Sequence, residues 1–320
     1  MLKVAIAGAA GFVGGELLRL LINHPNVGVV VPQSDSQSGK QVSTIHEDLF
    51  HLDLKFAESF DEDIDVLFVS KGHGWSRDHI SSLPGFNNAV VIDMSSDFRV
   101  EGEGNPFTYG LPEWQRNKIA GSDKIANCGC FATAIQLALL PLYRNHVVED
   151  EIHVHGITGS TGAGASKIDT THFSWRDSNV SIYKAFEHQH LDEVYQMANS
   201  FMPSAGHKVN FIPVRGNFTR GILVSAYTRT NSSIEELNEI FKSEYRDEPF
   251  VTVTDNPVHL KQVINTNHCL IKVDKYDDKV MVTSCIDNLL KGAAGQAVQN
   301  MNIRLGFPEN SGLILKAKAF

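Results

Sequence analysis

The sequence has no long hydrophobic run, few cysteines and no excess of positive charge. The longest apolar stretch, residues 132–142, is interrupted by Thr133, Gln136 and Pro141 and is too short to cross a bilayer. Four cysteines in 320 residues are too few and too scattered for a disulfide framework, so we expect free thiols in a reducing cytoplasm. The first residues carry no basic leader, and we expect no secretion.

The charge balance narrows the range of partners. A net charge of −9 argues against a broad nucleic-acid surface. A few local cations can still form a pocket in an acidic protein, so any bound phosphate should belong to a small molecule. We therefore expect neither a nucleic-acid nor a membrane partner.

The chain is long enough for two domains, and its first part has the pattern of a nucleotide-binding fold. Residues 2–7 predict a buried strand, residues 14–23 an amphipathic helix, and residues 27–31 a second strand. A strand, helix and strand within about 30 residues are typical of the first half of a doubly wound domain. Further strands at residues 66–69 and 90–92 favour a mostly parallel sheet.

The pattern changes after a helical run at residues 132–143. Alternating apolar and polar residues predict a mainly antiparallel second sheet, with strands at 151–157, 208–213, 221–228, 269–274 and 279–286. Further helices are predicted at 190–200, 233–244 and 292–305.

These elements predict an α/β protein of two domains. Residues 1–147 would form a Rossmann-type NAD(P)-binding domain, joined by the C-terminal helix and tail at about 290–320. Residues 148–289 would form an α+β domain for catalysis and oligomerisation. No linker rich in glycine or proline marks the boundary between them.

Gly8, Gly11 and Gly14 lie between the first strand and the first helix, with Phe12 and Val13 in the same turn. Missing side chains there let backbone N–H groups and the helix N-terminus approach a pyrophosphate. The spacing is GxxGxxG rather than the commoner GxGxxG. A tight turn that needs glycine only for packing is the alternative. In this strand, turn and helix setting we favour dinucleotide binding.

The end of the second strand bears on which cofactor is used. An acidic side chain there would bind the ribose hydroxyls and repel a 2′-phosphate. Ser34, Ser36 and Lys40 could hold a phosphate, whereas Asp35 could take the NAD role. This segment favours NADP only slightly, and a polar surface loop is the competing interpretation.

Cys130 directly precedes the helical run, so we expect it at a helix N-terminus. That position lowers the pKa of a thiol and supplies N–H donors for an oxyanion. Cys128 could suggest a metal pair, but metal-binding cysteines usually leave about two to four residues between them. No second pair follows at Cys269 or Cys285, so we expect no metal. Two small buried cysteines are the alternative to a nucleophile, and the residues alone do not decide.

His188 and His190 lie just before Glu193 at the start of a predicted helix. A nucleophilic thiol needs a base, and His190 with Glu193 one helical turn later is a plausible unit. With 14 histidines in the chain, a surface or packed histidine is the competing interpretation.

Further segments concentrate polar groups among glycines. Arg99 follows a strand, residues 159–164 form a turn that could act as an anion nest, and Arg215 and Arg220 flank another turn. Residues 288–295 again place glycines at a helix start. Each segment could hold an anion or contact a cofactor, and each could equally be a capped loop.

Taken together, these motifs resemble the N-acetyl-gamma-glutamyl-phosphate reductase family, an arginine-biosynthesis relative of aspartate-semialdehyde dehydrogenase. The resemblance spans nearly the whole chain and rests on the turn at Gly8 to Gly14, Ser96-Asp-Phe-Arg99, Tyr109-Gly-Leu-Pro-Glu113, Asn127-x-Gly-Cys130-Phe-x-Thr133, Ser160-Thr-Gly-Ala-Gly164, His188-x-His190 with Glu193, and Asp287-Asn288 to Gly295. Cys128 is a departure, since the family usually has proline there.

The resemblance implies reduction of an N-acyl-glutamyl phosphate to its semialdehyde, with NADPH as the donor, release of phosphate and a homo-oligomer, either a dimer or a tetramer. Cys130 would be the nucleophile that forms a thioester, and His190 the base, oriented by Glu193. The residues expected to bind substrate or phosphate are Arg99, Asn127, Arg215, Arg220 and His188. Those expected to bind NADP are Gly8, Gly11, Phe12, Val13, Gly14, Ser34, Ser36, Lys40, Ser160, Gly162, Asn288 and Gly292.

Two alternatives stay open at this point. One is a sister reductase of aspartyl or aminoadipyl phosphate, which would differ in the pocket for the acyl group. The other is a nucleotide-binding regulator that has lost catalysis.

Overall fold

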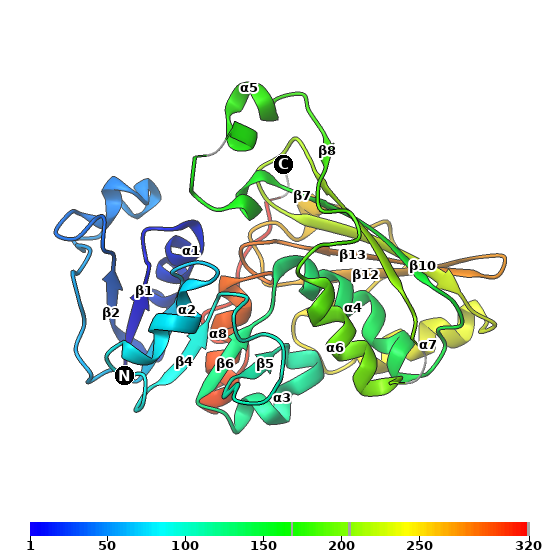
Figure 1. Ribbon diagram of the computed structural model, residues 1–320, viewed down its shortest axis with the longest axis horizontal. Coiled ribbons are helices and arrows are strands. Elements are labelled where there is room, and N and C mark those ends of the chain that lie inside the picture. The colour runs from blue at the N-terminus through cyan, green and yellow to red at the C-terminus, as the bar shows by residue number, and fades with distance from the viewer. Residues whose placement is uncertain (168, 204–205, 319–320) are drawn as a thin grey trace. The chain divides into compact units, whose positions relative to one another are not determined.

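A computed structural model describes residues 1–167, 169–203 and 206–318 (Figure 1). The chain forms two compact units, which are described separately below. The first contains Met1–Cys128 and Ala293–Ile314, and the second contains Gly129–Gly292 and the chain from Leu315 onward. The division therefore falls at Cys128, earlier than the predicted boundary at residue 147.

The first unit contains a six-stranded sheet in the order β2-β1-β3-β4-β6-β5. Every pairing in it is parallel, which confirms the mostly parallel prediction. The strands are β1 (Leu2–Ala7), β2 (Val27–Gln33), β3 (Val66–Val69), β4 (Val90–Asp93), β5 (Thr108–Gly110) and β6 (Lys124–Asn127). The order reverses at β1, since β2 lies on one side of it and β3 on the other. In such sheets a ligand binds at the carboxyl ends of the strands beside this reversal.

The first unit also contains α-helices. They are α1 (Phe12–Leu21), α2 (Trp75–His79), α3 (Pro112–Ala120) and α8 (Ala294–Arg304). In α1 the buried residues include Leu17, Leu18 and Leu21. The C-terminal α8 contacts α1, α3 and strands β4, β5 and β6, so it belongs to the first unit. Short 3-10 turns occur at η1 (Val42–Thr44), η2 (Glu47–Leu49) and η3 (Ile80–Ser82).

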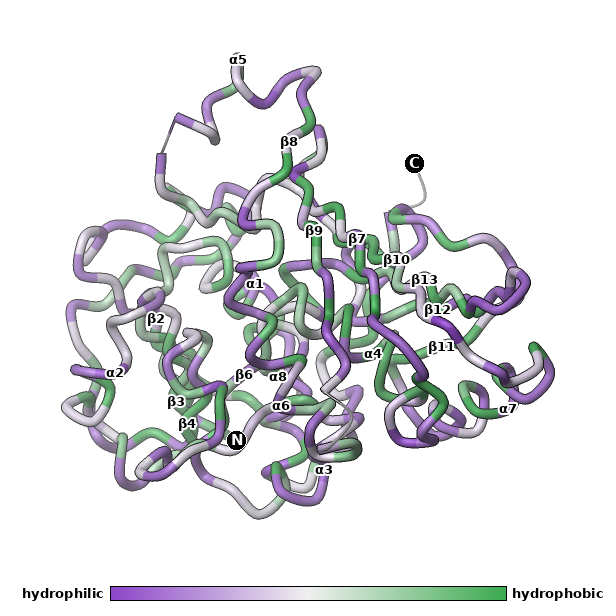
Figure 2. Tube along the Cα trace, turned by 45° about the vertical axis from the view of Figure 1, so that its right-hand side comes forward, coloured by the Kyte–Doolittle hydropathy of each residue, from purple (hydrophilic) through white to green (hydrophobic). Residues whose placement is uncertain are grey.

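The second unit contains a seven-stranded mixed sheet in the order β11-β12-β13-β10-β7-β9-β8. Its strands are β7 (Ile152–Thr158), β8 (Ser181–Ile182), β9 (Val209–Arg215), β10 (Ile222–Arg229), β11 (Val251–Val253), β12 (Cys269–Tyr276) and β13 (Lys279–Ile286). Only the pairs β7·β9 and β11·β12 are parallel, so the mainly antiparallel prediction is confirmed. Along β10, which lies between β7 and β13 in this sheet (Figure 2), residues alternate between buried and more exposed.

Helices α4 (Cys130–Arg144), α6 (Leu191–Phe201) and α7 (Ile234–Glu244) pack in this second unit, and α5 (Phe173–Arg176) is a single turn. The first of them, α4, contacts α6, β10 and β13, which is why the chain divides before it. Helix α7 begins with a capping box between Ser233 and Glu236. The 3-10 turns are η4 (Ser160–Ala163), η5 (Asp169–Thr171) and η6 (Leu260–Gln262). Within the described ranges, no helix has the length and apolar character needed to span a membrane.

Candidate active site

Cys130 is the first residue of α4, as the sequence predicted, and it is half-buried. The preceding Gly129 caps the helix with extended backbone, and the first turn contains no acidic residue. The first N–H groups of a helix have no partner within it, and the helix dipole places partial positive charge there. The position therefore favours the thiolate and offers N–H donors to an oxyanion.

Two buried side chains from the start of α6 lie against the backbone before Cys130. The Gly129 N–H donates to Oε2 of Glu193 at 2.9 Å. A Cβ added to Gly129 would lie 2.4 Å from Nε2 of His190 and 2.7 Å from Oε1 of Glu193. Only glycine leaves room for both groups, so the imidazole, the carboxylate and the thiol share one short stretch of backbone.

The contact between His190 and Glu193 is looser than the sequence suggests. Nε2 of His190 lies 4.0 Å from Oε1 of Glu193, which is within ion-pair range but longer than a hydrogen bond. The Glu193 carboxylate instead accepts the Gly129 N–H. That Glu193 orients the imidazole stays a prediction, because catalytic hydrogen bonds often tighten only when substrate is bound.

His188 occupies an aromatic pocket beside His190. Its ring centroid lies 5.7 Å from that of Phe131 and 5.4 Å from that of Phe211. Burial, with a smaller contribution from the charge of Lys184, lowers the pKa of His188 to about 4. Its Nδ1 accepts the backbone N–H of His190 at 3.2 Å, which places the proton of the neutral ring on Nε2. His188 is therefore neutral near pH 7, and it could contact a substrate anion only as an N–H donor.

Two residues that no sequence motif predicted, Tyr183 and Arg176, lie near the predicted Arg215. The Arg215 guanidinium lies 4.2 Å above the Tyr183 ring, and the Tyr183 and His188 rings are 5.7 Å apart. Burial and the nearby Cys130 thiolate raise the pKa of Tyr183. Burial and the charge of Arg215 lower the pKa of Arg176. No motif marks Arg176 or Tyr183 in the sequence.

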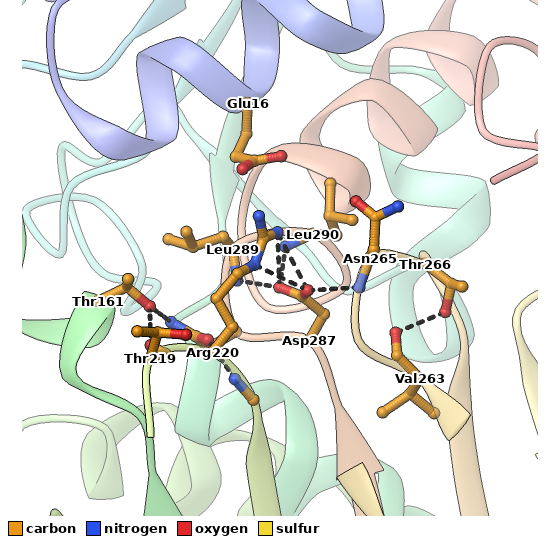
Figure 3. A network of polar contacts seen from close by, with 12 residues as sticks. Glu16, Thr161, Thr219, Arg220, Val263, Asn265, Thr266, Asp287, Leu289 and Leu290 are labelled. Atoms are coloured by element: carbon orange, nitrogen blue, oxygen red, sulfur yellow. Dashed lines mark hydrogen bonds and ion pairs between the residues drawn. The ribbon is translucent and has the colours of Figure 1, made fainter. Parts of the chain in front are cut away.

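Arg220 is held by a buried carboxylate (Figure 3). Its Nε donates to Oδ2 of Asp287 at 3.0 Å and its Nη2 to Oδ1 at 3.1 Å. Asp287 also accepts the backbone N–H groups of Asn265 and Leu289, each at 2.8 Å. The guanidinium thus braces the loop that follows β13, and its predicted contact with substrate stays a prediction.

The same network organises the four second-unit residues that were predicted to bind the cofactor, which are Ser160, Gly162, Asn288 and Gly292. Oδ1 of Asn288 accepts the Gly221 N–H at 2.7 Å, and its Nδ2 donates to Oγ1 of Thr161 at 3.0 Å. Asn288 therefore joins the turn that contains Ser160 and Gly162 to the loop that ends at Gly292. A Cβ on Gly292 would lie 2.9 Å from Cβ of Cys130, so this loop packs against the nucleophile.

In the first unit the glycine turn combines close packing with an open position. Gly8 has a positive φ of 88°, and a Cβ there would lie 2.4 Å from the Ser70 carbonyl oxygen. A Cβ on Gly14 would lie 2.6 Å from Cα of Ala9. Gly11 caps α1, and a Cβ there would meet only the Gly8 carbonyl oxygen, at 3.8 Å. Close packing thus explains why glycine is needed at positions 8 and 14, whereas the backbone at Gly11 is open to a ligand.

Two other residues of this turn, Phe12 and Val13, open helix α1. Phe12 is exposed and Val13 is half-buried. The first N–H groups of a helix have no partner within it, so this helix start has donors available for a pyrophosphate.

Asp35 follows β2, and its carboxylate is paired with a lysine. Nζ of Lys71, from the loop after β3, lies 2.7 Å from Oδ2 of Asp35, and Nε2 of Gln33 donates to Oδ1 at 2.7 Å. The Lys71 side chain is 9% exposed, so its charge is directed at this partner. The ion pair with Lys71 and the hydrogen bond from Gln33 lower the pKa of Asp35.

The residues predicted to hold a 2′-phosphate lie around Asp35. Ser34 is buried, whereas Ser36 and Lys40 are exposed. Nζ of Lys40 donates to Oε1 of Gln37 at 3.1 Å, and Gln37 in turn donates to Oγ of Ser36. Asp35 is thus paired with Lys71, and Lys40 lies in the loop that follows.

Arg99 and Asn127, also in the first unit, brace the end of β6. Nε of Arg99 donates to the Asn127 carbonyl and its Nη2 to the Met94 carbonyl, each at 2.8 Å. The Asn127 amide donates to the Ala293 carbonyl and accepts from Asn300, each at 3.0 Å. Both residues therefore fix the strand that leads into the cysteine turn, and their contact with substrate stays a prediction.

The two cysteines of this turn have different surroundings, which bear on whether each is a nucleophile or a small buried residue. Cys128 is buried, and its sulfur accepts from Nε2 of Gln296 at 2.9 Å and donates to the Gly110 carbonyl at 3.2 Å. Cys128 is thus a packed core residue, whereas Cys130 opens a helix. In the part of the chain that the structure covers, no group of three or more His, Cys, Asp or Glu residues is arranged to hold a metal.

Comparison with known families agrees with this division. The family model "Semialdehyde dehydrogenase, NAD binding domain" matches residues 3–122, and "Semialdehyde dehydrogenase, dimerisation domain" matches residues 130–288. Among solved structures, aspartate semialdehyde dehydrogenase II from Vibrio cholerae has the same fold. Its complex with ASA has a TM-score of 0.75 at 19% identity, over 96% of this chain and 98% of that one. The fold and the cysteine site thus define a protein of the semialdehyde dehydrogenase class.

Curated relatives narrow this class. Proteins named N-acetyl-gamma-glutamyl-phosphate reductase are 45% identical in Christiangramia forsetii, 48% in Azobacteroides pseudotrichonymphae and 46% in Parabacteroides distasonis, each over 100% of both chains. The chain belongs to the N-acetyl-gamma-glutamyl-phosphate reductase family, which confirms the resemblance seen in the sequence. It is an oxidoreductase that binds a nicotinamide cofactor.

Proposed function

We propose that this protein reduces an N-acyl-γ-glutamyl phosphate to the corresponding semialdehyde with NADPH, releasing phosphate, as a step of arginine biosynthesis. The observation that carries the proposal is Cys130 at the start of α4, with His190 and Glu193 packed on the preceding Gly129. Relatives named for this reaction match the whole chain.

The first half of the reaction is acylation of Cys130. The thiolate attacks the acyl carbon, a C–S bond forms, and the bond from that carbon to the phosphate oxygen breaks. The oxyanion formed during attack is stabilised by N–H groups at the start of α4. His190, beside Gly129, accepts the thiol proton before attack.

The second half reduces the thioester. The bound nicotinamide supplies the hydride for this step. His190 then returns a proton to Cys130 sulfur as the C–S bond breaks and the aldehyde leaves. The open backbone at Gly11 and the helix start at Phe12 would hold the pyrophosphate of the cofactor.

We propose NADPH rather than NADH, because Lys71 neutralises Asp35 at the end of β2. An unpaired carboxylate there would repel a 2′-phosphate. Because Asp35 is paired with Lys71, the ammonium of Lys40 and the hydroxyls of Ser34 and Ser36 could bind the 2′-phosphate.

Steady-state kinetics with both cofactors test this proposal, and NADPH should give the larger kcat/KM. The variant Lys71→Met should lower the ratio of NADPH to NADH kcat/KM by about tenfold. One unit charge at about 4 Å contributes about 1 kcal/mol in water and more at a protein surface. A clear NADH preference in the unchanged protein would show that Asp35 governs the ribose site.

The protein should also assemble with copies of itself, since its second unit matches a dimerisation domain. We propose a dimer or tetramer that uses the face of the second sheet opposite α4. On that face His153 stacks on the part-exposed Tyr227 with ring centroids 5.0 Å apart. Light scattering during gel filtration tests this, and a monomer at micromolar concentration would contradict it. A reactive thiol also needs a reducing compartment, and we place the enzyme in the cytoplasm.

An assay of the complete reaction tests the activity. Purified protein should consume NADPH in proportion to the semialdehyde and phosphate formed from N-acetyl-γ-glutamyl phosphate. A higher kcat/KM with aspartyl or aminoadipyl phosphate would instead assign the chain to a sister reaction. NADPH binding without turnover of any acyl phosphate would overturn the proposal in favour of a regulator.

A further inference from the structure

Two arginines of the second unit lie near Tyr183 and within electrostatic range of each other. Arg176 ends the short helix α5, and Arg215 ends strand β9. Asn217 joins their segments, since its amide, oriented to satisfy both contacts, donates to the Arg176 carbonyl at 3.1 Å and accepts the Ser178 N–H at 3.0 Å. Ser181 of β8 pairs with Arg215 in the ladder between β8 and β9.

These two arginines differ in their partners from other arginines of the unit. Other arginines of this unit have carboxylate partners, such as Arg220 with Asp287 and Arg229 with Asp278. Among the described residues, neither Arg176 nor Arg215 forms an ion pair with a carboxylate, and the buried Nη2 of Arg176 has no hydrogen-bond partner. A buried N–H donor left unpaired is costly, and so are two cations held together. An oxyanion bound between them would remove both costs.

The arginine pair and the nucleophile belong to the same unit and are connected by a chain of side chains. The Arg215 guanidinium covers Tyr183, and Tyr183 in turn interacts electrostatically with Cys130. From Tyr183 the rings continue to His188 at 5.7 Å and from there to His190 at 4.6 Å. Along these contacts Arg215 is linked to the thiol through the Tyr183 side chain.

This indirect link favours one group of the substrate over another. The phosphate leaves from the carbon that the Cys130 sulfur attacks, so it must lie directly beside the thiol. A carboxylate elsewhere in an N-acyl-glutamyl substrate lies several bonds farther from that carbon, which fits a site beyond Tyr183.

We propose that Arg176 and Arg215 together bind a carboxylate of the substrate, either the α-carboxylate of the glutamyl group or one at the far end of the N-acyl group. This inference rests on the proposed reaction and adds the group that the enzyme uses to recognise its substrate. The guanidiniums donate charge-assisted hydrogen bonds, and the Tyr183 ring holds Arg215 in place.

The test uses the reverse reaction of the full-length enzyme with NADP, inorganic phosphate and four semialdehydes. One pair carries an α-carboxylate or an α-carboxamide. The other pair carries an N-acyl group that ends in a carboxylate or in a carboxamide. The kcat/KM ratio of carboxylate to carboxamide is measured for the unchanged enzyme, Arg176→Gln and Arg215→Gln. Arg229→Gln, at an exposed ion pair on β10, is the matched control.

One of the two ratios should fall by about 10-fold to 100-fold in both Gln variants and stay unchanged in the control. The pair that loses discrimination identifies which carboxylate is bound. Arg176→Lys should restore part of the ratio, because a lysine keeps the charge. A purely structural role would lower kcat/KM for carboxylate and carboxamide alike.

Two results would overturn the inference. Both ratios could stay unchanged in the Gln variants, or only the KM for inorganic phosphate could rise, which would assign the arginines to phosphate. If the unchanged enzyme turned over none of the four semialdehydes, the proposed reaction itself would fall, and this inference with it.

Discussion

Replacing Gly129 by alanine tests the packing at the cysteine turn. The new methyl group would lie 2.4 Å from Nε2 of His190 and 2.7 Å from Oε1 of Glu193, whereas real Cβ atoms essentially never approach another heavy atom within 3.0 Å. The imidazole and the carboxylate must therefore shift by roughly 1 Å to reach ordinary contact. Added volume in a packed site costs about 1 to 3 kcal/mol, and a catalytic group misplaced by about 1 Å can lose about 100-fold in rate.

The assay compares kcat/KM for the acyl phosphate, the melting temperature and the Kd for NADPH. We expect kcat/KM to fall by about 100-fold and the melting temperature to fall with it. The Kd for NADPH should stay unchanged, because the glycine turn lies in the other unit. Gly121→Ala is a matched control, since its Cβ would meet nothing closer than 3.7 Å. Unchanged kcat/KM in Gly129→Ala would refute the packing of His190 and Glu193 on this turn.

Three further predictions concern the thiol and the histidines. Cys130→Ser should abolish turnover while NADPH still binds. Cys128→Ser should keep most activity, because Cys128 is a core residue. An active Cys130→Ser together with an inactive Cys128→Ser would mean that the wrong sulfur was assigned as the nucleophile. His190→Asn should slow acylation by about 100-fold to 10,000-fold, more than His188→Asn, with a smaller loss in Glu193→Gln. Single-turnover phosphate release across pH measures this, and unchanged acylation in both histidine variants would remove His190 from the mechanism. Finally, burial lowers the pKa of His188 from 6.5 to about 4, so the unfolded chain binds a proton that the folded chain does not between these values. The free energy of unfolding should therefore fall as the pH falls from 6.5 to about 4. His188→Asn should flatten that slope in denaturant titrations, and an equal slope would contradict the buried neutral ring.

Periodicity in the sequence predicts the longer elements well. Strand β1 has the predicted bounds, and α4, α6, α7 and α8 begin or end within a few residues of prediction. Strands β5 and β6, of three and four residues, are too short to show an alternation.

The sequence of α4 does not indicate to which domain this helix belongs. Nearly every residue of this helix is buried, so the sequence contains no polar face that would indicate which sheet it covers. Only the packing against β10, β13 and α6 places it in the second unit.

The candidate active site was also only partly predictable from the sequence. Cys130, His190 and Glu193 are recognisable because they lie in motifs with a local reason for their spacing. Lys71, Arg176 and Tyr183 are not recognisable, because each acts through a contact that only the folded chain creates. Lys71 lies 36 residues from its partner Asp35, and no pattern in either segment predicts their meeting.

The proposed reaction depends on a thioester formed on Cys130. It is tested most directly by mixing enzyme with one equivalent of N-acyl-γ-glutamyl phosphate in the absence of NADPH. Phosphate release is followed in time, and the acylated peptide is identified by mass spectrometry. We expect a rapid release of about one phosphate per chain, with the acyl group on Cys130, and no release in Cys130→Ser. A burst that persists in Cys130→Ser, or an acyl group found on another residue, would contradict it.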